Sequence, residues 1–175
     1  MVITRTISKE RIISVSLGVT ILCLFSQMQI PIKPVPISSA TIAVMLLGLL
    51  FASKDALFSC LLYISLGACG LPVFAGYNSG VPYLLGPTGG YLLGYAVASY
   101  SMSYLREKIN RTSFVYTLLY CSIGNVCLYS CGLLWLMTFM RMSFHQAANV
   151  GILPFIIPGC IKIIALATLL RLIRK

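Results

Sequence analysis

The chain has 175 residues, of which 59% are hydrophobic and 9% are charged, and its mean hydropathy is +0.96. Soluble domains carry charge on about a quarter of their residues, so this composition excludes a soluble fold and predicts an integral membrane protein. A spanning helix takes about 20 mainly apolar residues, which limits the chain to about six spans. We therefore expect a single transmembrane domain over residues 1–175.

Apolar segments separated by turn signals divide the chain into six predicted helices. Three prolines between residues 31 and 36 follow the first helix, and Gly70 and Pro72 end the third. Prolines and glycines of this kind commonly mark helix ends. The predicted fold is an all-α bundle. Its helices are expected at residues 11–30, 38–52, 56–70, 88–105, 114–139 and 159–173.

Two connections between the predicted helices differ from simple turns. Residues 71–87 are rich in glycine, proline and tyrosine, yet Leu71, Phe74 and Leu85 are too apolar to lie in water. Irregular backbone at membrane depth is tolerated only where it is buried in protein or lines a cavity, so we expect this loop to dip into the protein. The other connection, residues 141–158, is predicted as a short polar piece followed by two prolines.

The positions of the basic residues predict the orientation in the membrane. With a cytoplasmic N-terminus, ten Lys and Arg residues fall on the cytoplasmic side and two, Lys33 and Arg141, fall outside. This asymmetry follows the positive-inside rule and predicts that both termini are cytoplasmic. It also explains the net charge of +10 without nucleic acid as a partner. The ten are Arg5, Lys9, Arg11, Lys54, Arg106, Lys108, Arg111, Arg171, Arg174 and Lys175.

The chain lacks the residues that catalysis or independent energy coupling would need. Its three acids, Glu10, Asp55 and Glu107, lie at predicted cytoplasmic edges, whereas proton- and sodium-driven carriers commonly use acids inside the membrane. There is no GxxxxGK[ST] loop for ATP, and a single histidine, His145, leaves no catalytic or metal site. We expect a non-enzymatic binding protein without a cofactor, whose energy comes from elsewhere.

Lys162 is the most informative charge, because it lies about one turn into the last predicted helix, whose N-terminus faces outward. A lysine and a helix N-terminus together favour an anion such as a carboxylate. The alternative is a lysine that extends to the membrane interface. Residue position alone leaves both interpretations open.

Other polar side chains lie on the predicted fifth helix and in the outer loop. Ser122, Asn125 and Tyr129 form a polar stripe, which serves either helix association or a ligand. Asn78 and Tyr83 could donate hydrogen bonds to a polar ligand. Small residues at positions 90, 94 and 98 form a ridge that predicts close helix packing, and Tyr91, Tyr95 and Ser99 beside it could face a cavity.

The segment Gly86–Tyr95, GPTGGYLLGY, closely resembles the GPTGGYL signature of the BioY family. Members of this family are the biotin-binding S components of energy-coupling factor (ECF) transporters. Three further blocks agree with the family in order: Pro34–Ile37, Gly70–Gly76 and Leu153–Gly159. The resemblance spans nearly the whole chain.

The resemblance implies a six-transmembrane-helix S-component bundle in a bacterial cytoplasmic membrane, with biotin bound beneath the loops that follow the first and third helices. It also implies a membrane coupling subunit and two ATPase subunits as partners. Lys162 occupies the place of a family lysine that helps to bind substrate, and biotin's carboxylate would be its anion. The implied substrate-binding residues are Lys162, Asn78, Tyr83, Gly86, Thr88, Tyr91 and Asn125.

Two positions depart from the family pattern. Cys160 stands where the family usually has an aspartate, and Ala40 where it has a glutamine. Two alternatives therefore stay open. One is an S component for another small vitamin-like acid, and the other is a structural or assembly membrane protein whose small-residue ridges only pack helices.

Overall fold

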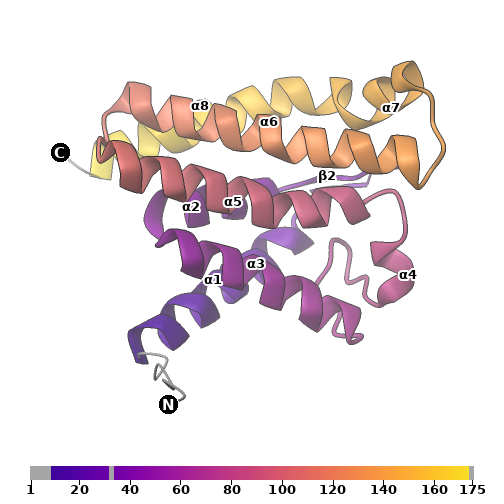
Figure 1. Ribbon diagram of the computed structural model, residues 1–175, viewed down its shortest axis with the longest axis horizontal. Coiled ribbons are helices and arrows are strands. Elements are labelled where there is room, and N and C mark those ends of the chain that lie inside the picture. Colours follow the sequence, from indigo (N-terminus) through magenta and orange to yellow (C-terminus); the bar gives the residue numbers. More distant parts are fainter. Residues whose placement is uncertain (1–8, 32–33, 174–175) are drawn as a thin grey trace, which may run out of the picture.

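Helices make up most of the computed structural model, which describes residues 9–31 and 34–173 (Figure 1). The basic residues Arg5, Lys33, Arg174 and Lys175, counted above for orientation, lie outside the described residues. The elements in chain order are α1 (Lys9–Gln27), β1 (Gln29–Ile30), β2 (Ile37–Ser38), α2 (Ala40–Leu50), α3 (Ser53–Ala68), α4 (Val81–Leu84), α5 (Gly89–Ile109), α6 (Phe114–Thr138), α7 (Phe144–Gly151) and α8 (Leu153–Ile173).

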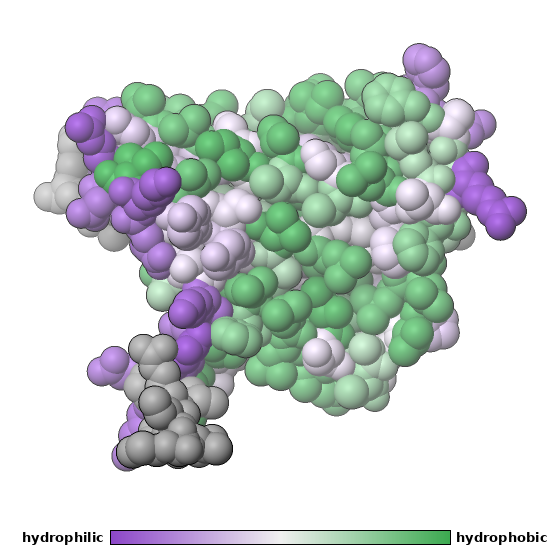
Figure 2. Space-filling model, in the orientation of Figure 1, coloured by the Kyte–Doolittle hydropathy of each residue, from purple (hydrophilic) through white to green (hydrophobic). Residues whose placement is uncertain are grey.

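The two ends of the bundle differ in character. The beginning of α1 and the end of α8 lie at one end, here called the charged end, and the β1–β2 hairpin, α4 and α7 lie at the other, the hairpin end (Figure 1). Hydrophobic residues cover the middle of the face shown in Figure 2. Within the described residues, three helical stretches are long and apolar enough to cross a membrane: Lys9–Gln27, Phe114–Thr138 and Phe144–Leu172. The chain is therefore a mostly helical membrane protein.

The predicted start of the last helix at residue 159 was wrong. Helix α8 begins at Leu153, because Pro154 lies in its first turn, where a missing N–H costs no helical hydrogen bond, and Pro158 is held inside the helix. The polar piece before it was predicted as part of a connection, but it forms α7. A capping box between Ser143 and Gln146 begins that helix.

The segment that connects α1 to α2 is more ordered than predicted, and helix α5 is longer than predicted. Gln29 pairs with Ser38, and Ile30 with Ile37, so the proline segment is the loop of a short antiparallel hairpin. Helix α5 continues to Ile109, four residues beyond its predicted end at 105, and stops at Asn110 in the left-handed conformation.

Small residues bring α5 and α6 into close contact, as the sequence predicted. A Cβ atom on Gly90 would overlap Trp135 of α6, and one on Gly94 would lie 3.0 Å from a Leu128 methyl. From the other side, a Cβ atom on Gly132 would overlap the ring of Tyr91. The ridge therefore packs helices and also fixes the ring of Tyr91.

The loop that precedes α4 is anchored by Phe74, whose side chain is completely buried. Its ring lies against Gly67, where any larger residue would collide with it. It meets Tyr63 edge-on with the ring centroids 5.6 Å apart and stacks on Tyr83 at 5.2 Å. This confirms that the loop dips into the protein, although Leu71 and Leu85, expected to be buried, are exposed.

The side chain of Gln27, the last residue of α1, forms hydrogen bonds with the backbone of the same loop. Its Nε2 donates to the carbonyls of Val73 and Phe74 at 3.2 and 3.3 Å, and its Oε1 accepts the N–H of Tyr77 at 3.0 Å. An amide is suited to this because it offers donors and an acceptor together. The loop position thus depends on α1.

At the charged end, two consecutive residues of α5 form hydrogen bonds with the turn between α2 and α3. The guanidinium of Arg106 donates to the carbonyls of Leu49 and Phe51 at 2.9 and 2.7 Å. The carboxylate of Glu107 accepts from the backbone N–H and the hydroxyl of Ser53 at 2.7 and 2.9 Å. A cation therefore stabilises the C-terminus of α2 and an anion stabilises the N-terminus of α3, which satisfies groups that helix ends leave unpaired.

We expect Glu107→Ala to lower stability by about 1 kcal/mol, the usual effect of losing a helix N-terminal cap. Glu107→Gln keeps one acceptor oxygen and should lose less. Thermal unfolding of the ligand-free protein in detergent measures both. Lys108→Ala is the matched control, since Lys108 is exposed on the same turn. Equal melting temperatures for Glu107→Ala and Lys108→Ala would contradict this role of Glu107.

Candidate functional site

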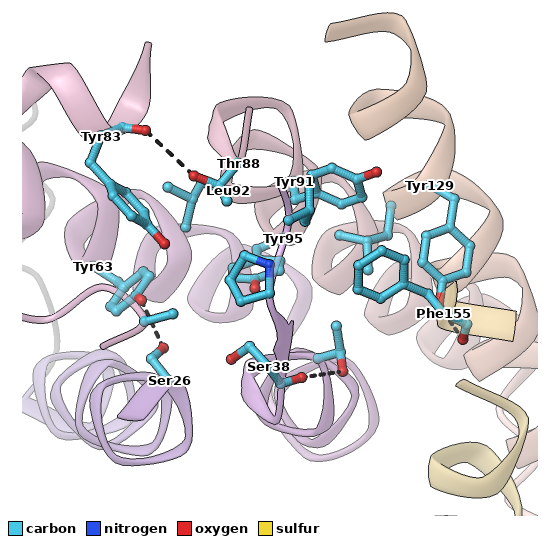
Figure 3. A pocket seen from close by; sticks show the side chains of 15 residues that line it. Ser26, Ser38, Tyr63, Tyr83, Thr88, Tyr91, Leu92, Tyr95, Tyr129 and Phe155 are labelled. Carbon is cyan, nitrogen blue, oxygen red and sulfur yellow. Dashed lines mark hydrogen bonds between the residues drawn. The ribbon is translucent and has the colours of Figure 1, made fainter. Parts of the chain in front are cut away.

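A small enclosed cavity lies at the hairpin end, between the β1–β2 hairpin and helices α3, α5 and α6 (Figure 3). About 40 Å³ of it is open to the centre of a water molecule, which is room for about three waters. Its walls are mainly aromatic and aliphatic. They comprise Ser26, Val35, Pro36, Ser38, Thr41, Tyr63, Ala75, Tyr83, Thr88, Tyr91, Leu92, Tyr95, Leu128, Tyr129 and Phe155.

Five tyrosines line the cavity, and three of them use their hydroxyls to bind the protein itself. Tyr63 donates to the carbonyl of Val73 at 3.1 Å, and Tyr91 to that of Gly151 at 2.7 Å. Tyr129 donates to a carbonyl in the first turn of α8 at 3.3 Å. These three rings are therefore structural walls with satisfied polar ends.

Of the other two, the Tyr83 hydroxyl has the Thr88 side chain as a hydrogen-bond partner, whereas no hydrogen bond with the described part of the chain reaches the Tyr95 hydroxyl. Burial raises the pKa of the Tyr83 phenol, which therefore stays protonated and able to donate. A polar ligand in the cavity would meet one hydroxyl, that of Tyr95, without a partner in the described part of the chain.

A second, larger pocket of about 410 Å³ lies next to the cavity and opens to the surface; we call it the vestibule. Four residues line both spaces: Pro36 from the hairpin, Ala75 from the loop after α3, Tyr83 from α4, and Thr88 just before α5. These four residues form a partition between the vestibule and the cavity. Movement of the partition would join the two spaces into one site.

Lys162 connects α8 to the cavity wall. Its Nζ donates to the carbonyl of Ser38 at 2.7 Å and to the hydroxyl of Thr41 at 2.8 Å. The Thr41 hydroxyl in turn donates to the same Ser38 carbonyl at 3.3 Å. Because Ser38 and Thr41 both line the cavity, the ammonium lies directly behind its wall.

The charge of Lys162 has no opposite charge beside it within residues 9–31 and 34–173. All three acids of the sequence are in these ranges, and the salt bridge found there joins Arg11 to Asp55 at 3.0 Å. An ammonium has three N–H donors, and the two bonds above use two of them. A half-buried cation without a counter-ion is unfavourable, so an anion entering the cavity would gain its full attraction.

The structure changes the reason for expecting Lys162 to bind an anion. The residue lies more than two turns into α8, which begins at Leu153, so support from a helix N-terminus was wrong. Extension to the interface was also wrong, because the Nζ points inward to Ser38 and Thr41. The anion interpretation now depends on the charge and its burial alone.

The other predicted site residues divide between the two spaces. Tyr83, Thr88 and Tyr91 line the cavity, whereas Asn78 and Gly86 line the vestibule. The geometry brings these five together, and ligand contact stays a prediction for each.

Asn125 is not brought to either space. It lies in the interface of α6 and α8, where a Cβ atom on Gly159 would be 3.4 Å from its Nδ2. Ser122, predicted to share its stripe, is exposed. The vestibule residues also have structural partners, since the Asn78 Nδ2 donates to the Ala75 carbonyl at 2.7 Å and Gly86 accepts the indole N–H of Trp135 at 3.0 Å.

Sequence reasoning missed several cavity residues. Ser38 and Thr41 directly follow the Pro34–Ile37 block, so that block was a usable signal for them. Tyr63 had no local signal, because only the tertiary fold brings α3 to the cavity. Neither departure from the family pattern adds a polar group to the cavity wall: Cys160 is exposed and Ala40 is buried.

Comparison with known proteins agrees with this arrangement. The model of the BioY family matches residues 3–175. A probable biotin transporter BioY of Pyrococcus horikoshii is 35% identical over 85% of this chain and 86% of its own length. The biotin transporter BioY2 of Lactococcus lactis subsp. cremoris is 34% identical over 86% of this chain and 82% of its own.

A crystal structure of the S-component for biotin from an ECF-type ABC transporter has the same fold. It superposes with a TM-score of 0.84 at 24% identity and covers 99% of this chain and 95% of its own. The bundle described above is thus an S-component fold. From the family match over nearly its entire length and the similarity to these relatives, the chain belongs to the BioY family.

Proposed function

We propose that this protein is the biotin-capturing S component of an ECF-type importer. The relatives of similar length are named as biotin transporters. The observation that carries the proposal in this chain is Lys162, a half-buried cation without a carboxylate partner, behind the wall of a cavity lined by tyrosines. Biotin has the matching chemistry, with a carboxylate on a flexible chain and an uncharged polar ring.

The binding geometry follows from the donors that remain unused. The third N–H of Lys162 would bind the biotin carboxylate by a charge-assisted hydrogen bond, since the Thr41 hydroxyl already donates to the Ser38 carbonyl. The aromatic walls would contact the thiophane ring and the aliphatic chain. The unpaired hydroxyl of Tyr95 would then face a polar part of the ligand.

The ligand would enter by way of the partition. The cavity has room for about three waters, far less than a bicyclic vitamin needs, while the adjoining vestibule is about ten times larger, 410 against 40 Å³. Biotin would therefore displace the partition residues, chiefly the loop that carries Ala75 and the short helix α4 that carries Tyr83. The loop would close over the bound ligand afterwards.

We propose six membrane crossings, by α1, α2, α3, α5, α6 and α8, with both termini cytoplasmic and the hairpin end outside. The basic residues Lys54, Lys108 and Arg171 near the charged end support this orientation. Helix α2 has 11 residues and spans about 16 Å, so the hairpin that precedes it would complete that crossing.

The protein would depend on partners for energy, and it is a transport component and not an enzyme. All its acids lie toward the charged end, near the beginning of α1, the α2–α3 turn and the end of α5. A proton or sodium coupling site in the membrane interior would need acids or a broken-helix ion site. We propose that an ECF coupling subunit and two ATPase subunits supply the energy in a bacterial cytoplasmic membrane.

Removal of the Lys162 charge should weaken biotin binding by at least about 30-fold, because truncating one partner of a buried charge pair costs at least about 2 kcal/mol. Isothermal titration calorimetry on the purified protein measures this for Lys162→Met. Lys162→Arg keeps the charge and should lose less. Biotin amide, which has no carboxylate charge, should bind the unaltered protein and Lys162→Met about equally.

The same titrations separate the alternatives. A folded protein that binds no biotin would overturn the proposed function and favour a structural role. Tighter binding of another vitamin-like acid would keep the transporter and change its substrate. A uniform loss of affinity for biotin and biotin amide in Lys162→Met would reject the carboxylate contact.

Biotin should also slow backbone hydrogen exchange in the segment 74–84, because closing over the ligand would order the loop and α4. Hydrogen–deuterium exchange with mass spectrometry, with and without saturating biotin, measures this. Peptides from residues 100–109 of α5, at the charged end and outside both spaces, are the internal control and should change little. Unchanged exchange in 74–84 with biotin bound would show that this loop is not a lid.

A further inference from the structure

Tyr95 differs from the other four cavity tyrosines, because their hydroxyls have hydrogen-bond partners in the protein. Its side chain is 7% exposed, and its ring lines the cavity wall contributed by α5, behind the partition (Figure 3). Within residues 9–31 and 34–173, no hydrogen bond reaches its hydroxyl. The hydroxyl is not among the fully enclosed unpaired atoms of these residues, so it faces the cavity, where a ligand can reach it.

The neighbouring tyrosine Tyr63 shows what a structural hydroxyl looks like here. Its side chain is 1% exposed, and its hydroxyl lies 2.7 Å from the Ser26 hydroxyl and 3.1 Å from the Val73 carbonyl. Phenylalanine at position 95 would fill the same wall without leaving a donor unpaired. The Tyr95 hydroxyl instead faces the cavity, which has room for about three waters, so it can exchange water for a polar group of a ligand.

Tyr95 is also held in place before a ligand arrives. It lies one turn after Tyr91 and next to Gly94, on the part of α5 that packs closely against Leu128 of α6. Tyr83, whose side chain is hydrogen-bonded to Thr88, is on the short helix α4 in the partition and would move when the partition opens. Tyr95 therefore offers a fixed hydrogen-bonding group, which is what discrimination between similar ligands requires.

We infer that the Tyr95 hydroxyl is a specificity-determining contact that binds the ureido group of biotin; this rests on the proposed function. The two polar ends of biotin differ in charge. The carboxylate is drawn to Lys162, behind Ser38 and Thr41, which leaves the uncharged ureido ring for the uncharged phenol. The phenol can donate to the ureido oxygen, the strongest acceptor of the ring.

The test compares Tyr95→Phe with Tyr63→Phe in the full-length protein. Without ligand, Tyr63→Phe should lower the melting temperature because it loses two bonds, whereas Tyr95→Phe should leave it unchanged or raise it. In calorimetry, Tyr95→Phe should weaken biotin binding about tenfold, the effect of one net hydrogen bond. For 2-thiobiotin, in which a sulfur atom replaces the ureido oxygen, the loss should be under about threefold, since sulfur is a weak acceptor.

Each outcome decides something. Failure of the unaltered protein to bind biotin would overturn the proposed function and this inference together. Normal binding by the unaltered protein with an unchanged Kd in Tyr95→Phe would overturn the inference alone. An equal loss for biotin and 2-thiobiotin would likewise reject contact with the ureido oxygen, and a melting temperature lowered as much as in Tyr63→Phe would show that the hydroxyl is structural.

Discussion

The ammonium of Lys162 is held between α8 and the beginning of α2 by hydrogen bonds to the Ser38 carbonyl and the Thr41 hydroxyl. Neutral oxygens reduce the cost of burying a cation, but they do not neutralise it. Because the acids of the chain lie toward the charged end, this charge has to be balanced by something that enters from outside the protein. An anionic ligand is the natural counter-ion, and this requirement determines which class of molecule the cavity accepts.

The rest of the structure holds one end of the bundle fixed and leaves the other adjustable. Arg106 and Glu107 bind the α2–α3 turn to α5, and the ridge of small residues on α5 packs closely against α6. At the hairpin end, the loop before α4 is held chiefly by two contacts. These are the buried ring of Phe74 and the hydrogen bonds of the Gln27 amide to the loop backbone. A cavity whose floor is rigid and whose cover depends on few contacts can capture a ligand larger than its resting volume.

The crossing helices could be predicted from the sequence because long apolar segments bounded by proline, glycine and charge leave few alternatives. The bounds of the helix predicted at 114–139 were nearly correct for that reason. The start of α8 could not be found by the same rules, since Pro154 and Pro158 were treated as helix breakers, although Pro154 lies in the first turn, which tolerates proline, and Pro158 lies inside the helix. The hairpin at Gln29–Ser38 also escaped prediction, because it has two residues in each strand and no alternating pattern.

The site was partly predictable as well. Lys162 and the residues of the GPTGGYL segment stood out by charge and by the family resemblance, and the family itself is confirmed. Tyr95 was expected beside a cavity and lines it, but Tyr63 could not be identified, and a tyrosine in an apolar helix gives no sign of whether its hydroxyl is paired. That distinction arises only when α3, α5 and the loop around Val73 meet. Asn125 illustrates the opposite error, a polar residue on the expected helix that faces Gly159 instead of the cavity.

The most direct test of this account is an experimental structure of the protein with biotin bound. The account predicts that the biotin carboxylate lies within hydrogen-bond distance of the Lys162 Nζ, inside a cavity that has merged with the vestibule. A carboxylate that points to the surface, with Lys162 still bonded only to Ser38 and Thr41, would contradict it.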